Sequence, residues 1–168
     1  MISREWAMTM ARYNKWQNAN LYGAADSRSD AARREDRGAF FRSIHGTLSH
    51  ILWADHVWLS RFTAREKPST PQAESGGYVA DWAELKDRRD STDGELARWA
   101  ASLTPEDISG EYRWFSGGEG REMAMPMAQI VSHVFNHQTH HRGQVHAMLT
   151  AAGATPGATD LFVLPDAG

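Results

Sequence analysis

The sequence predicts an all-α fold, an up-and-down bundle of four helices, on three observations. Apolar side chains recur at three- and four-residue steps in four long segments, which is the spacing of amphipathic helices. Turn-rich or proline-containing stretches separate those segments. The chain has 168 residues, the length of one domain, and contains no internal repeat. We therefore expect residues 1–168 to form a single four-helix bundle domain.

The first half of the chain contains two of the predicted helices. One apolar stripe predicts a helix over residues 3–24. In residues 26–38 arginines are offset by acidic residues, which indicates a solvated connector with room for a helical turn. A second stripe predicts a helix over residues 40–63. We expect residues 66–77 to be a loop, because the prolines there cannot continue a helix.

A third helix and a short hairpin are expected next. The helix covers residues 79–103, with tryptophans and leucines at the apolar positions and a charged middle. Residues 111–125 contain two short runs around a glycine-rich turn, and Tyr112 and Trp114 alternate with polar residues in the first run. This pattern predicts a small β-hairpin before the last helix, with an irregular loop as the alternative.

The fourth helix is expected to begin at Pro126 or Met127, since proline suits a first helical position. It ends near Ala152, where Gly153 is a suitable C-terminal cap. The turn-rich tail carries one apolar patch, Leu161–Leu164, which we expect to pack back on the bundle.

Composition excludes several classes of function. The formal net charge of −3 provides no positive field to hold phosphate backbones, so no nucleic-acid partner is expected. The chain has no cysteine, so no disulfide can form and any thiol used in a reaction must come from outside. The longest stretch without Asp, Glu, Lys or Arg, residues 123–141, is too rich in His, Asn and Gln to span a membrane. Charged residues also interrupt the N-terminal segment, so we expect no signal peptide, no membrane association and a cytoplasmic location.

The eight histidines lie in two segments and none lies between residues 57 and 132. Residues four apart on a helix can converge on one ion, and both His133/His137 and His137/His141 have this spacing in the last helix. Spacing does not choose between the two pairs. A third ligand would come from the second helix, which offers His45, His50 and His56.

Imidazoles in this number indicate a metal site. Neutral imidazole suits zinc, nickel, copper and ferrous iron, and three protein ligands leave a position open for water or a substrate. The frame of His137 and His141 also matches the metalloprotease motif H-E-x-x-H, but Gln138 stands where that motif has its glutamate. Glutamine cannot accept a proton from a bound water, so a metalloprotease is not expected.

Four strings of residues resemble the DinB family over nearly the whole chain. They are YNKW (residues 13–16), LSHILWAD (48–55), HVFNHQTHHRGQ (133–144) and TPGATDL (155–161). The resemblance implies a four-helix bundle, often a homodimer. It also implies a metal triad of one histidine from the second helix and two from the last, which are His50, His137 and His141 here.

The wider superfamily to which this resemblance points includes enzymes that depend on low-molecular-weight thiols. It implies a divalent metal ion, with nickel and zinc as the expected choices, and a thiol as a second cofactor. Two functions follow as hypotheses. The first is a metal-dependent transferase that adds a thiol to a small-molecule substrate. The alternative is a non-enzymatic module in which the ion stabilises the bundle.

Further polar residues have both structural and functional interpretations. Asp55 lies about 140° around the helix from His50, so we expect it to contact a neighbouring helix or an imidazole rather than the same ion. Tyr13 and Asn14 either line the mouth of the site or pack. Arg142 meets an anionic ligand or forms a salt bridge, for instance with Asp55. The remaining histidines of the last helix, His133, His140 and His146, are expected on the surface or behind the ligands.

Overall fold

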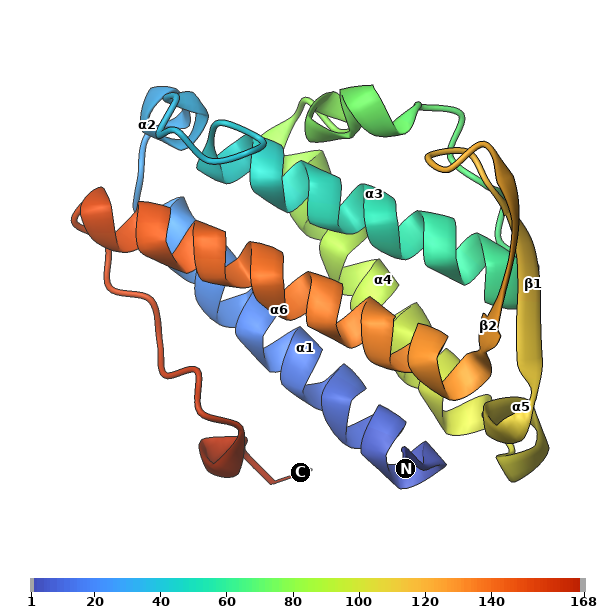
Figure 1. Cartoon of the computed structure of the whole chain (residues 1–168). Helices are drawn as coiled ribbons and strands as arrows, with labels where there is room; N and C mark the ends of the chain where they lie inside the picture. Colours follow the sequence, from blue (N-terminus) through green and yellow to red (C-terminus); the bar gives the residue numbers. More distant parts are fainter. Residues whose placement is uncertain (1, 167–168) are drawn as a thin grey trace.

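Four long helices form a bundle in this computed structural model, which describes residues 2–166 (Figure 1). They are α1 (Arg4–Asp26), α3 (Ile44–Phe62), α4 (Trp82–Ser102) and α6 (Met127–Ala151). Helices α1 and α3 each pack against both α4 and α6. The predicted all-α bundle is therefore confirmed.

The direction of the helices departs from simple alternation. Leu59 near the end of α3 packs with Trp99 near the end of α4, whereas Leu48 packs with Leu85 close to their beginnings. Helices α3 and α4 therefore run in the same direction. The connection between them, residues 63–81, returns along α3 and includes the 3₁₀ helix η1 (Gln72–Gly77), which packs on α3 (Figure 1).

The second long helix, α3, begins at Ile44, four residues later than the start of the helix expected over residues 40–63. Ser43 is the N-cap of α3, and its hydroxyl accepts a hydrogen bond from the amide of Gly46. Arg42 before it has a φ of +65°, which breaks the helical path. Phe40 and Phe41 consequently lie in a turn ahead of the helix.

The β-hairpin is confirmed, and it stands across one end of the bundle (Figure 1). Strand β1 (Glu111–Ser116) pairs antiparallel with β2 (Arg121–Pro126). Tyr112 and Trp114 lie on the same face and pack against the bundle core. Two shorter helices occupy connectors, α2 (Asp30–Arg34) and α5 (Pro105–Ser109), and the 3₁₀ helix η2 (Leu161–Val163) lies in the C-terminal tail.

The expectation that Leu161–Leu164 packs back on the bundle is wrong for most of that patch. Phe162 is 87% exposed, and Leu161 and Val163 are also exposed. The tail is held instead by its backbone. The hydroxyl of Tyr13 donates a hydrogen bond of 2.5 Å to the carbonyl of Thr159. Thr159 lies just before the apolar patch, so the contact holds the tail but not the patch itself.

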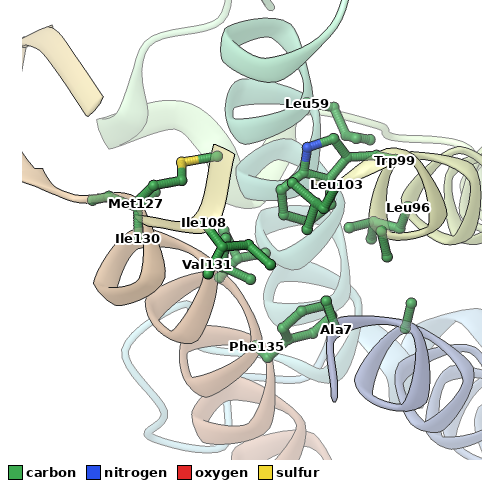
Figure 2. Close-up of a cluster of buried hydrophobic side chains, with 13 residues drawn as sticks. Ala7, Leu59, Leu96, Trp99, Leu103, Ile108, Met127, Ile130, Val131 and Phe135 are labelled. Carbon is green, nitrogen blue, oxygen red and sulfur yellow. The ribbon is translucent and has the colours of Figure 1, made fainter. Parts of the chain in front are cut away.

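Two apolar clusters make up the core. Figure 2 shows the first, where Trp99 and Phe135 lie among aliphatic side chains at the hairpin end of the bundle. The second cluster joins the opposite ends of the same four helices and includes Leu48 and Leu149. Within the described residues, no helix is both long and apolar enough to cross a membrane.

A buried polar layer lies between the two clusters along all four helices. Arg89 of α4 pairs with Asp55 of α3 over 2.6 Å and with Asp93 over 2.9 Å, and all three side chains are buried. Asn18 of α1 donates to Asp93, and Gln138 of α6 contacts Asp55. Hydrogen-bonded charges of this kind fix the helices in register, because sliding one helix would leave buried charge unpaired.

Candidate metal centre

Three histidines converge between α3 and α6. His50 comes from α3, and His137 and His141 lie one turn apart on α6. One ring nitrogen from each lies within 4.8 Å of the others. The Nε2 atoms of His50 and His137 are 3.4 Å apart. The structure thus groups the His137/His141 pair with His50.

Hydrogen bonds set the tautomer of the His50 ring. The hydroxyl of Ser75 donates to the carbonyl of Gln72 over 2.6 Å, so the Ser75 oxygen is left to accept. His50 Nδ1 lies 2.8 Å from that oxygen and therefore carries the proton. The Nε2 lone pair of His50 consequently points at the other two histidines.

His141 is oriented in a similar way from its own helix. Its Nδ1 lies 2.8 Å from Oε1 of Gln144, one turn further along α6, and donates to it. This leaves Nε2 of His141 as the nitrogen available for a ligand bond. Hydrogen bonds from the far nitrogen are a usual feature of histidines that hold metals, because they fix the ring and raise its basicity.

An aromatic ring closes one side of the cluster. Phe41 stacks on His50 with ring centroids 3.7 Å apart and an angle of 18°, and its edge meets His141 at 5.4 Å. The turn that precedes α3 carries Phe41 to this position. The Phe41 carbonyl lies so close to Gly46 that a side chain there would collide with it.

Burial keeps the cluster neutral near pH 7. Burial, and then the neighbouring histidines, lower the pKa of both His50 and His137 to about 3. Burial also lowers the pKa of His141, although the hydrogen bond that its Nδ1 donates to Gln144 acts in the opposite direction. Neutral imidazoles keep their lone pairs, which is the form that binds a metal ion.

The cluster fits a small divalent ion. Zinc binds imidazole nitrogen at about 2.0–2.1 Å, so two ligands at tetrahedral angles are about 3.3 Å apart. The His50–His137 distance of 3.4 Å agrees with that spacing. All three donors are imidazoles, which suit zinc and nickel alike. Within the described residues this is the one group of three or more His, Asp or Glu side chains close enough to hold an ion.

The other histidines lie outside this group. His45 Nε2 lies 2.8 Å from the carbonyl of Val79, and His56 is held by Thr92 and Tyr78. The last-helix histidines His133, His140 and His146 are exposed or half-buried.

Asn14, Tyr13 and Arg142 lie between α1 and α6, not at the histidine cluster. Arg142 contacts the Asn14 amide oxygen, and burial lowers the pKa of its guanidinium to about 10. The expected salt bridge between Arg142 and Asp55 is wrong, since Arg89 takes that carboxylate. Asp55 has the structural role expected of it and contacts a neighbouring helix.

Ser75, Gln144 and Phe41 were not singled out from the sequence. Gln144 closes the HVFNHQTHHRGQ string and could have been found by its place three residues after His141. Ser75 lies in a connector without a regular pattern, so no signal marks it. The expected helix over residues 40–63 placed Phe41 in its first turn, and that position gives no sign of the contact with the ring of His50.

A cavity of about 650 Å³ opens beside the cluster. His50 and His137 lie in its wall, and three tryptophans, Trp53, Trp58 and Trp114, line it. The volume is within the range of sites for small molecules. A ligand in the cavity would therefore lie next to the histidines.

Substituting Gly46 tests how closely the Phe41 turn is tied to α3. We expect Gly46→Ala to lower the free energy of unfolding by about 1–3 kcal/mol, because the new Cβ collides with the Phe41 carbonyl. Urea unfolding measures this. Gly23→Ala is the matched control in α1, where a Cβ meets open space, and it should be neutral or stabilising by up to about 1 kcal/mol. Equal effects in both variants would contradict the close approach.

Comparisons of the sequence with known proteins find one family and one curated relative, but no solved structure. The model of the DinB family matches residues 2–167. Among curated proteins, the chain is similar to Protein DinB of Bacillus subtilis (strain 168), with 23% identity over 157 residues, covering 93% of this chain and 91% of that protein. No solved structure matches significantly.

Proposed function

This chain belongs to the DinB family, and we propose that it binds one divalent transition metal ion through His50, His137 and His141. The observation that carries the proposal is the convergence of three neutral imidazoles, with one ring nitrogen of each within 4.8 Å of the others. Ser75 and Gln144 support it, because they hold the far nitrogens of His50 and His141. Zinc and nickel are both ions that imidazole ligands suit, and we propose one of these two for the site.

We propose further that the chain is a metal-dependent thiol transferase. A bound ion supplies a Lewis acid that lowers the pKa of a thiol or water placed on it. The chain has no cysteine, so the thiol would be a low-molecular-weight cofactor. Sulfur would form a bond to an electrophilic carbon of the substrate, while the thiol proton departs with the leaving group.

The residues of the chain would contribute binding and orientation to this reaction. His50, His137 and His141 would hold the ion, and Phe41 shields one side of the His50 ring from water. The cavity beside the cluster would hold the substrate. Among the described residues no Asp or Glu side chain joins the three histidines as a ligand, and the one carboxylate that lines the cavity, Glu119, is exposed in the hairpin turn, so we propose thiol transfer rather than hydrolysis.

One observation favours the non-enzymatic alternative. The three histidines come from two helices, α3 and α6, so an ion bound by them would also stabilise the bundle. In that function the ion has a structural role and the protein acts as a binding module. We also propose, from the family, that the chain works as a cytoplasmic homodimer and one domain.

The metal content per chain tests the proposed site. Tag-free protein, purified without added metal or chelator, is expected to carry about one equivalent of zinc or nickel by mass spectrometry. His137→Ala should lose the ion, because two imidazoles bind it far more weakly than three. His146→Ala is the matched control, since His146 lies on the same helix and outside the group.

Metal that stays in His137→Ala would contradict the assignment of the ligands. Wild-type protein that holds no metal and cannot be loaded would remove the metal function altogether. If metal is bound and raises the melting temperature, but no thiol is transferred to a panel of electrophiles, the non-enzymatic module is the better description.

A further inference from the structure

One half-buried cation in the cavity has no acceptor among the described residues. Arg61 lines the cavity from α3, and within residues 2–166 its guanidinium forms no hydrogen bond or ion pair. The Cζ atom of Arg61 lies 4.3 Å from the ring centroid of Trp58 and 5.6 Å from that of Trp114. Its side chain is half-buried, and burial lowers the pKa of its guanidinium. A half-buried guanidinium without an anion has donors ready for a ligand.

The other charged side chains of the cavity wall do not neutralise Arg61. Lys67 and Glu119 also line the cavity, but both are exposed. Glu119 lies in the hairpin turn, and Lys67 in the connector after α3. The interior therefore keeps one net positive charge against aromatic walls.

The cavity connects Arg61 to the histidine cluster. His50 and Arg61 are about three helical turns apart on α3 and so lie on the same face, with about 16 Å between them along the axis. Trp58 lies between them in the sequence of α3. Its ring centroid is 5.3 Å from that of His133, and the ring centroids of His133 and His137 are 5.7 Å apart. An elongated ligand could reach from the guanidinium toward the histidines along this wall.

We propose that the cavity binds a small aromatic carboxylate, whose carboxylate pairs with Arg61 and whose flat body lies against Trp58 and Trp114. Guanidinium and carboxylate form two parallel hydrogen bonds, which fixes the orientation of the anion. The parts of these indole rings that Arg61 does not cover offer the apolar surface that an aromatic body prefers. If this ligand is also the substrate, that part of the inference rests on the proposed function. Its binding in the cavity does not depend on the proposed function.

The probe is 2-naphthoate, compared with its neutral isostere 2-naphthamide, by isothermal titration calorimetry at neutral pH. We expect the full chain to bind naphthoate at least about tenfold more tightly than naphthamide. Arg61→Met should lower the naphthoate affinity by about tenfold and leave the naphthamide affinity unchanged. Arg113→Met is the matched control, since Arg113 is exposed on the hairpin and does not line the cavity.

Equal affinity for the two probes in the wild-type chain would overturn the proposal without the need for any variant. So would unchanged naphthoate binding in Arg61→Met. Measurements on metal-loaded protein, on metal-stripped protein and on His137→Ala separate this proposal from the metal function. Naphthoate binding that depends on Arg61 but not on metal supports the anion site even if the metal function fails. Binding that requires metal but not Arg61 would mean that the carboxylate binds the ion, which overturns the proposal.

Discussion

Arg89→Met is expected to lower the free energy of unfolding by about 3–5 kcal/mol, since breaking a buried ion pair leaves charge without a partner. Arg89 is 3% exposed and lies between Asp55 and Asp93, which are also buried. Methionine fills a similar volume but carries no charge, so both buried carboxylates lose the cation that pairs with them. Urea unfolding followed by circular dichroism measures the loss.

The neighbouring Arg88 provides the control on the same helix. Arg88 pairs with Glu84 over 2.5 Å, but both side chains are about half exposed. Arg88→Met should therefore cost about 1 kcal/mol or less. Asp55→Asn should cost less than Arg89→Met, because burial already raises the pKa of Asp55 to about 6 and so reduces the penalty for a neutral side chain. A loss in Arg89→Met no larger than that in Arg88→Met would contradict a structural role for the polar layer.

Local patterns were sufficient to predict the long helices and the hairpin. The apolar stripes located α1, α4 and α6 to within a few residues, because helical periodicity is a property of neighbouring residues. The start of α3 was missed by four residues. Phe40 and Phe41 are apolar enough to extend a stripe, yet the Ser43 cap and the left-handed conformation of Arg42 decide where the helix begins.

Contacts between distant segments could not be predicted from spacing. Helical spacing alone leaves two histidine pairs possible on α6. The resemblance to the DinB family implies the pair His137 and His141, which is the pair that the structure places next to His50. The partner of Asp55 was misjudged, because which arginine faces it depends on how α3 and α4 are oriented. Their common direction follows from a connector that returns along α3, and no local pattern in that connector indicates its path.

Acidification is expected to destabilise the metal-free protein strongly. Burial lowers the pKa of His50, His56 and His137 from an ordinary value of 6.5 to about 3. A histidine whose pKa is lower in the folded state takes up its proton on unfolding. Its contribution to stability is therefore complete above pH 6.5 and is lost as the pH falls toward 3.

For His50 and His56, which are 3% and 1% exposed, the expected loss between pH 7 and pH 4.5 is about 2 to 3 kcal/mol each, and it is smaller for the partly exposed His137. Asp55 opposes it, because a carboxyl whose folded pKa is raised to about 6 binds a proton more tightly when folded. Three histidines outweigh one carboxyl, so the sign of the net effect is a loss of stability in acid. Urea unfolding across this pH range measures it.

His56→Gln separates the contribution of burial from that of the metal site. His56 is 1% exposed and lies between Thr92 and Tyr78, away from the proposed ligands. Glutamine can still form hydrogen bonds there but does not titrate, so the variant should lose less stability per pH unit than the wild type between pH 6.5 and 4.5. Parallel profiles for the two proteins would mean that His56 is not kept neutral by burial. A shallower profile would show that acid destabilises the bundle in part through a buried histidine that lies outside the proposed metal site.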